Sequence, residues 1–286
     1  ATMTRNVLGS RGALLVVTIC ALTLGLGVTT PASAARPTPR ESTRLAKTDA
    51  GPDGIALDNY GNIYTANSRA NTVTKIGPNG KASTLGTTGE KPRGIAVDGS
   101  GNVYTSNLKS NNVTKITPAG VSTILGTTGQ QPIDVAVDAD GNVYTTNYVD
   151  STVTKITPGG VSSTLGATGS RPLGIVLDRD SNVYTADEGS DTVTKITPDG
   201  VASTLGSTGA WPQAITIDTA GNVYTANWNA RSVSKITPSG RSKIIGRTGR
   251  RPIGITIDLN GNIYTTNDGA NSVSEIVTGG KSKVIA

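Results

Sequence analysis

The stretch DADGNVYTTNYVDSTVTKITPGG, residues 138–160, has the pattern of a turn, a strand, a loop and a second strand. Asp, Gly and Asn occupy the predicted turns, while Val, Tyr, Thr and Ile fill the predicted strands. Nearly the same stretch recurs at residues 98–120 and again at 218–240. The chain is therefore built from copies of one small β unit.

The copies follow one another at a fixed step of 40 residues. Tyrosines and aspartates keep this step, and so do the prolines Pro52, Pro92, Pro132, Pro172, Pro212 and Pro252. A period of this length is typical of repeat architectures, in which each repeat is one supersecondary unit.

Each unit is predicted to contain four short strands, at residues 94–98, 103–107, 112–117 and 121–126 in the second copy. Val113 and Ile116 fall on opposite faces of their strand, because successive side chains alternate. Apolar side chains on both faces indicate a sheet that is covered on both sides.

These features predict an all-β fold, a six-bladed β-propeller of four-stranded antiparallel blades. A parallel β-helix is the alternative, but its repeats are shorter. The propeller is expected to span residues 42–286, with repeats near 52–91, 92–131, 132–171, 172–211, 212–251 and 252–286.

The ends of the chain leave the closure of the ring open. Residues 42–48 match the fourth strand of a repeat, and so do residues 281–286. Seven candidate outer strands thus compete for six places. The sequence does not decide which of the two terminal segments completes the last blade.

The first 34 residues have the pattern of a secretory signal peptide. Arg5 and Arg11 precede the apolar run at 13–28, and small residues end at Ala34, where cleavage is expected. A retained membrane anchor is the alternative, although the run is short for a span. We expect a secreted, extracellular protein with a linker at 35–41 and no stable membrane span after cleavage.

Composition excludes several kinds of chemistry. The chain has no His, and its one cysteine, Cys20, lies in the predicted signal peptide. Serine–histidine, cysteine–histidine and histidine–metal sites are therefore not available, and carboxylates, Lys and Tyr remain for proton transfer. The formal charge of +6 is scattered rather than clustered, so no nucleic-acid partner is expected. We expect a monomer.

The aspartate that ends each first strand recurs in every unit, as Asp58, Asp98, Asp138, Asp178, Asp218 and Asp258. We interpret it as a turn residue whose carboxylate accepts backbone N–H groups. A ring of six carboxylates around a cation is the alternative. The recurring tyrosines are interpreted as packing residues.

The residues that differ between copies lie in the second-to-third-strand loops and in the linkers between units, which share one face of a propeller. Rigid scaffolds that present varied loops commonly form binding surfaces, and aromatic and Arg side chains are enriched in them. The candidate binding residues are Trp211, Trp228, Tyr148, Glu188, Asp187, Arg93, Lys109, Arg231 and Arg251.

The unit GIAVDxxGNVYTxN…TVTKITPxG resembles NHL-repeat propellers, in particular the extracellular sensor propeller of a mycobacterial serine/threonine protein kinase. A second resemblance is to streptogramin (virginiamycin B) lyases, which share the GI, strand and loop positions. That resemblance implies a seven-bladed propeller that uses a His and a Glu with magnesium, whereas this chain has no His. NHL propellers are mostly interaction platforms.

Two function classes follow. The first is a non-enzymatic recognition domain that binds a protein, a peptide or a cell-envelope glycan through its loop face, with no cofactor. The alternative is a lyase or lactonase-type enzyme with a carboxylate–metal centre at the channel mouth, around Asp187, Glu188 and Asp191, which would need a divalent metal.

Overall fold

The structure is a computed structural model that describes residues 16–17, 45–277 and 281–285. The predicted linker at 35–41 and the predicted signal peptide, apart from Val16–Val17, lie outside the described residues. None of the described segments forms a helix with the length and apolar character needed to cross a bilayer.

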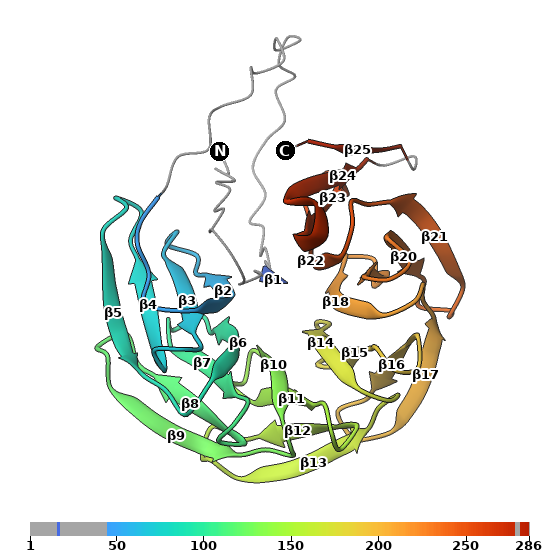
Figure 1. Cartoon of the computed structure of the whole chain (residues 1–286). Coiled ribbons are helices and arrows are strands. Elements are labelled where there is room, and N and C mark those ends of the chain that lie inside the picture. Colours follow the sequence, from blue (N-terminus) through green and yellow to red (C-terminus); the bar gives the residue numbers. More distant parts are fainter. Residues whose placement is uncertain (1–15, 18–44, 278–280, 286) are drawn as a thin grey trace, which may run out of the picture.

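Six sheets surround a central axis, as predicted for a six-bladed propeller (Figure 1). Each blade contains four antiparallel strands that follow the chain from the axis outward. The innermost strands are β2 (Pro52–Leu57), β6 (Pro92–Val97), β10 (Pro132–Val137), β14 (Pro172–Leu177), β18 (Pro212–Ile217) and β22 (Pro252–Ile257). We number the blades one to six in this order.

The second strands are β3 (Ile63–Asn67), β7 (Val103–Asn107), β11 (Val143–Asn147), β15 (Val183–Asp187), β19 (Val223–Asn227) and β23 (Ile263–Asn267). The third strands are β4 (Thr72–Ile76), β8 (Asn112–Ile116), β12 (Thr152–Ile156), β16 (Thr192–Ile196), β20 (Ser232–Ile236) and β24 (Ser272–Ile276). The outer strands are β5 (Ala82–Thr87), β9 (Ser122–Thr127), β13 (Ser162–Ala167), β17 (Ala202–Ser207), β21 (Ser242–Arg247) and β25 (Ser282–Val284). A 3-10 turn, η1 (Asp268–Ala270), replaces the plain loop of blade six.

The core lies between neighbouring blades, because each blade buries both of its faces. Val113 packs toward blade three and Ile116 toward blade one, and both are fully buried. Tyr104 lies in the same layer as Val113, which confirms its predicted packing role. Each such aliphatic side chain contributes about 2 kcal/mol through its burial.

The repeating contact is interrupted where blade six meets blade one. Tyr264 and Val273 are half-buried, whereas their counterparts in the other blades are buried. Thr266 has a buried hydroxyl without a hydrogen-bond partner, although the equivalent Thr146 hydroxyl donates to the Leu173 carbonyl of the next blade. The short strand β1 (Val16–Val17) pairs in parallel with β2 and also contacts β22 (Figure 1).

The closure left open by the sequence is now resolved. The C-terminal strand β25 pairs with residues 274–276 of β24 and so forms a short outer strand for blade six. The N-terminal segment instead packs Leu45 and Ala46 on Ile55, Ile63 and Ile76 of blade one. The Asp49 N–H donates to the Thr74 hydroxyl, as the Gly89 N–H does to Thr114 in the next blade. This segment therefore lies where the preceding blade's outer strand would join blade one.

Each first turn is held by the carboxylate of its aspartate. In blade two, Asp98 Oδ1 accepts the N–H groups of Ser100 and Asn102, both at 2.9 Å. Its Oδ2 accepts Asn102 Nδ2 at 2.8 Å and the Tyr104 hydroxyl at 2.9 Å. The same four bonds occur in all six blades. The predicted turn role is confirmed.

These hydrogen bonds also set the ionisation of the turn. Burial by itself would raise the pKa of Asp98, but the bonds from Asn102, Tyr104 and Ser100 outweigh it and lower the pKa. Burial and the adjacent carboxylate raise the pKa of the Tyr104 hydroxyl. At neutral pH the pair is therefore an ionised acceptor and a neutral donor.

We predict that Asp98→Ala lowers the free energy of unfolding by about 2–4 kcal/mol, because the turn N–H groups and the Tyr104 hydroxyl lose their acceptor. Because the folded-state pKa of Asp98 is lowered, this contribution is fully present above pH about 4, the ordinary carboxyl pKa. It is lost as the pH falls through the folded-state pKa. Urea denaturation at pH 7 and pH 3 measures both effects. The exposed Asp140→Ala is the control, with a change within about 0.5 kcal/mol; equal losses in the two variants would contradict the turn role.

Candidate functional site at the channel mouth

The variable segments gather on one end of the propeller, which we call the top face: the loops between second and third strands and the linkers that precede each inner strand. Backbone hydrogen bonds join loop to linker within each blade. The first loop residue donates to the linker carbonyl, for example Tyr148 N to Gln131 O at 3.1 Å and Trp228 N to Trp211 O at 2.8 Å. The first turns, including Tyr60, lie at the opposite end.

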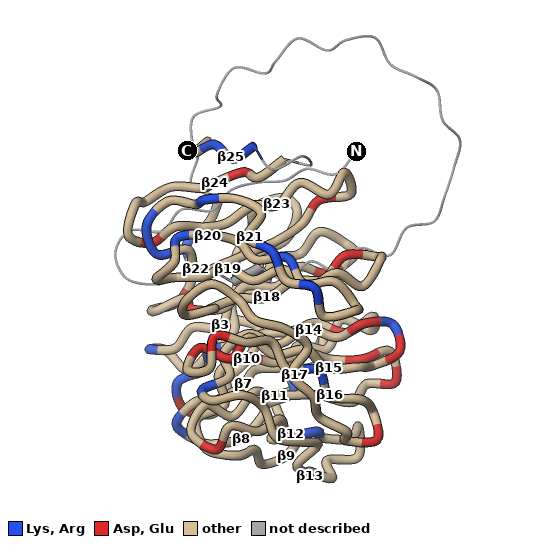
Figure 2. Tube along the Cα trace, turned by 90° about the vertical axis from the view of Figure 1, so that its right-hand side faces the viewer, with Lys and Arg blue, Asp and Glu red and all other residues tan. Residues whose placement is uncertain are grey.

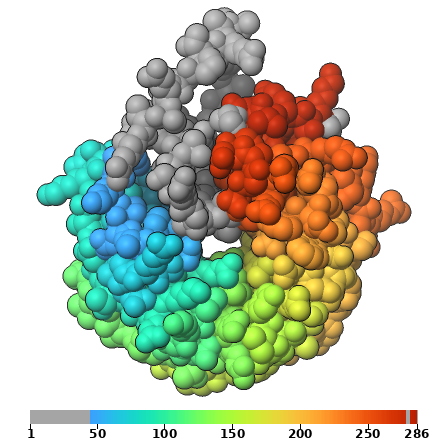
Figure 3. All heavy atoms as spheres, viewed as in Figure 1, coloured from blue at the N-terminus to red at the C-terminus, as the bar shows by residue number. Residues whose placement is uncertain are grey.

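The linker residue in this contact has a left-handed backbone. The φ angle is 54° at Gln131, 59° at Trp211 and 54° at Arg251. Non-glycine residues adopt this conformation at a cost of about 1 kcal/mol or more. The fold thus fixes the backbone at these positions, at one end of the ring that surrounds a central opening (Figure 3).

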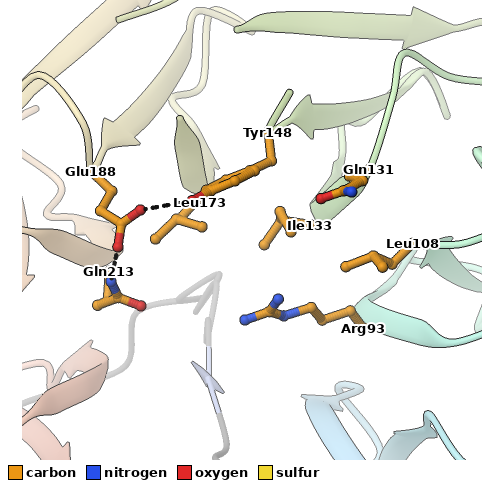
Figure 4. A pocket seen from close by; sticks show the side chains of 8 residues that line it. All are labelled: Arg93, Leu108, Gln131, Ile133, Tyr148, Leu173, Glu188 and Gln213. Carbon is orange, nitrogen blue, oxygen red and sulfur yellow. Dashed lines mark hydrogen bonds between the residues drawn. The ribbon is translucent and has the colours of Figure 1, made fainter. Parts of the chain in front are cut away.

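A pocket with a volume of about 300 Å³ opens at this mouth (Figure 4). Blades two to five contribute to it through their loops, one linker and the first residues of their inner strands. Its lining residues are Arg93, Leu108, Gln131, Ile133, Tyr148, Leu173, Glu188 and Gln213. Three apolar side chains therefore share the pocket with a cation, an anion, a phenol and two amides.

Glu188 is the polar centre of one wall. The Tyr148 hydroxyl donates to Glu188 Oε2 at 3.2 Å, and Gln213 Nε2 donates to Glu188 Oε1 at 3.3 Å. The Arg93 guanidinium extends from the other side toward the open middle of the pocket (Figure 4). Burial raises the pKa of Tyr148, and the Glu188 carboxylate raises it further. Tyr148 is therefore a neutral donor at physiological pH, and the pocket offers a ligand both signs of charge.

Asp134 is a residue that the sequence analysis did not select. It lies on β10 at the position that the other blades fill with Gly54, Gly94, Gly174, Ala214 and Gly254. Asp134 Oδ1 accepts the Val135 N–H at 2.9 Å, and Oδ2 accepts the Ile175 N–H of the next blade at 3.2 Å. Burial raises its pKa to about 6, although these bonds and Arg93 act in the opposite direction. The sequence could have identified Asp134, because it occupies a repeat position at which the other five blades have Gly or Ala.

Asp187 does not reach the surface. It is fully buried at the end of β15, where the other blades have an asparagine. The hydroxyls of Thr185, Thr192 and Thr194 donate to its carboxylate. Burial raises the pKa of Asp187 to about 6, against the effect of these hydrogen bonds. Asp187 thus belongs to the layer beneath the loops and not to the pocket.

The two tryptophans lie together on the top face. Their ring centroids are 5.1 Å apart with an interplanar angle of 23°, and the Arg251 guanidinium lies 5.1 Å from the centroid of Trp228. Arg231 and Lys109 are exposed in the loops of blades five and two. Asp191 accepts the Trp211 N–H at 2.7 Å. Tyr148, Glu188 and Arg93 thus share the pocket, whereas Trp211, Trp228 and Arg251 form a separate stack.

Asp187, Glu188 and Asp191 were predicted as the alternative carboxylate–metal centre. The structure does not bring them together in one group, because each carboxylate accepts hydrogen bonds from different partners. Throughout the part of the chain that the structure describes, no three His, Cys, Asp or Glu side chains lie together in a way that could hold a metal ion.

The fold and this mouth define a β-propeller with a ligand-sized pocket at one end of its channel. The virginiamycin B lyase family model matches residues 83–285, which is more than half of the chain, and the protein belongs to this family. The comparison with curated protein sequences gives no match.

Three solved structures share the fold. Virginiamycin B lyase from Staphylococcus aureus superposes with a TM-score of 0.73 at 18% identity, over 83% of this chain and 85% of that one. A catalytically inactive His-to-Ala variant of that lyase, with quinupristin, gives 0.73 at 19% identity over 82% and 84%. A gluconolactonase from Xanthomonas campestris gives 0.60 at 16% identity over 83% and 88%.

We predict that Asp187→Asn raises the free energy of unfolding at pH 8 by about 2 kcal/mol, since an amide replaces a buried charge. Because burial raises the folded-state pKa of Asp187 to about 6, the contribution of this residue to stability is fully present below pH about 4 and is lost as the pH rises through about 6. The gain should therefore vanish near pH 4. Denaturant unfolding across this range measures the difference.

The reverse change, Asn147→Asp in blade three, is the matched control. This variant should be less stable than the wild type at pH 8 by a similar amount. The difference in the free energy of unfolding should disappear toward pH 4. A loss of stability in Asp187→Asn at pH 8 would show that the buried carboxylate is better accommodated than an amide.

Proposed function

We propose that the protein is a secreted recognition propeller, which binds a peptide, protein or envelope-glycan ligand at the mouth of its channel without histidine-dependent chemistry. The observation that carries this proposal is the pocket itself. Arg93 and the Tyr148–Glu188–Gln213 group face each other across apolar side chains. Such a pocket suits a ligand that has both polar and apolar groups.

The absence of histidine supports binding rather than catalysis. In the lyase family a His-to-Ala variant is described as catalytically inactive, and its structure contains quinupristin. A propeller of this kind can thus hold a ligand after a histidine has been lost. The chain of 286 residues has no His at all, so binding is the function that its mouth supports best.

Family membership favours a second candidate, a lyase or lactonase-type enzyme. Asp134, whose pKa is raised to about 6, has the acidity of a general acid or base. Both of its oxygens, however, accept backbone N–H groups. Asp134 does not line the pocket, and the carboxylate that does, Glu188, also accepts two hydrogen bonds. An enzyme here would have to displace these bonds to free a carboxylate.

The resemblance of the repeat to NHL propellers supports an interaction role. The signal-peptide pattern of residues 1–34 supports secretion, so the proposed ligands are extracellular molecules. No metal is required by the binding proposal, whereas the enzymatic candidate would need a divalent ion if it followed the lyase family.

We predict that quinupristin or a soluble cell-wall muropeptide binds the chain that begins after Ala34, and that calorimetry detects this binding. Glu188→Gln and Arg93→Gln should each weaken binding about tenfold or more, because each removes a charge-assisted contact. Asp180→Asn, in an exposed turn at the opposite end, should leave the affinity unchanged. The recovered ligand should be chemically unaltered by chromatography and fragmentation mass spectrometry.

Turnover of the ligand would support the enzymatic candidate instead. Absence of binding by every probe, or equal affinities of the Glu188, Arg93 and Asp180 variants, would contradict a binding site at the mouth.

A further inference from the structure

The stack of Trp211, Trp228 and Arg251 lies beside the pocket but is not part of it. Trp211 comes from the linker that precedes β18, Trp228 from the loop after β19, and Arg251 from the linker that precedes β22. Trp228 is half-buried, while Trp211 remains 44% exposed. A flat indole surface is therefore presented on the top face of blade five.

Exposed arginines lie in the same two blades as this indole surface, and one of them, Arg251, contacts Trp228. Arg231, Arg247, Arg250 and Arg251 are all exposed in the loop, strand end and linker of the same two blades. In Figure 2, Lys and Arg segments lie near β20 and β21 on both sides of the view, so this region of the ring carries basic residues at both of its ends. The one ion pair among the described residues joins Lys283 to Glu275 at 2.7 Å, so none of these four arginines is in an ion pair there. The guanidinium groups of this surface are thus not paired with a carboxylate of the described residues.

The backbone beneath the stack lacks a hydrogen bond that the repeat provides in other blades. In other blades the linker N–H is held by a loop side chain, as Lys91 N is by Asn71 Oδ1 at 2.8 Å and Trp211 N is by Asp191 Oδ1 at 2.7 Å. At the position equivalent to Asp191, the loop of blade five has Arg231. Its side chain has no hydrogen-bond acceptor to offer the Arg251 N–H. Blade six therefore lacks a stabilising hydrogen bond and has another arginine in its place.

We infer that this arginine–tryptophan surface binds an anionic sugar chain, such as an oligosaccharide of uronic acids. The apolar face of a pyranose ring can pack on the exposed indole of Trp211, as flat apolar groups do on aromatic rings. The carboxylates of the sugar match guanidinium groups, which bind them through paired charge-assisted hydrogen bonds. A neutral sugar would satisfy only the first requirement.

The boundaries of the surface argue for a short ligand of this kind over a nucleic acid. Proteins that bind single-stranded nucleic acids follow the backbone along an extended basic groove. Here the four arginines lie in blades five and six, whereas the loop of blade four carries the carboxylates of Glu188 and Asp191, so the positive charge does not continue as one groove around the ring. A few sugar residues fit this extent.

The chain provides its own probe for a test, because Trp211 and Trp228 are its two tryptophans. An alginate hexasaccharide should change the tryptophan fluorescence saturably. The neutral cellohexaose should bind at least about tenfold more weakly, because it has no carboxylates to form charge-assisted hydrogen bonds with the arginines. Higher salt should weaken alginate binding.

Variants separate the inferred site from a structural role. Arg251→Gln should weaken alginate binding about tenfold, while Arg251→Lys retains the charge and should lose less. Arg179→Gln, in an exposed turn at the opposite end, is the matched control and should bind like the wild type. Thermal unfolding confirms that each variant is folded.

Four results would overturn the inference: no saturable fluorescence change, equal binding of cellohexaose, tighter binding of a single-stranded DNA hexanucleotide, or equal affinities of the Arg251 and Arg179 variants. The inference does not rest on the pocket proposed above. Loss of muropeptide binding in Glu188→Gln with intact alginate binding would separate the two sites.

Discussion

In every blade, one carboxylate binds the turn between the first two strands and also the hydroxyl of a buried tyrosine. This contact fixes where the inner strand ends, and it anchors the tyrosine that packs against the next blade. Because the first turn is fixed at one end, the loops and linkers must lie at the other. The top face, its pocket and its stack all depend on this geometry. The structural residues therefore repeat, and the loops are free to vary.

The departures from the repeat have a physical cost. Asp134 places a carboxylate in a column of small residues, and Asp187 places one where asparagine suffices. Arg231 replaces a residue that in other blades supplies a hydrogen-bond acceptor for the linker N–H. Asp134 lies on the inner strand of a blade that lines the pocket, and Arg231 lies on the top face. Residues that break local rules are commonly retained for function, so this clustering supports a binding role for that end of the propeller.

Much of the fold could be predicted from the sequence, because periodicity directly reports the repeat. The 40-residue step predicted the blades, and the recurring Asp98 and Tyr104 predicted the turn and the packing. The closure could not be predicted, since residues 42–48 and 281–286 have equivalent patterns. The burial of Asp187 was missed because it directly precedes a variable loop. The pocket joins residues from four blades, and the contact between Trp211 and Trp228 depends on a loop-to-linker bond, so neither is visible in local sequence.

Hydrogen–deuterium exchange with and without a bound ligand tests most directly whether the varied end of the ring is the recognition surface. The account predicts that a muropeptide or an alginate oligosaccharide protects the loops and linkers of the top face, such as residues 88–93, 188–191 and 228–231. The first turns, such as 98–102, should exchange at the same rate in both states. Protection confined to those turns or to the outer strands would contradict the account, because the ligand would then bind where the blades are alike.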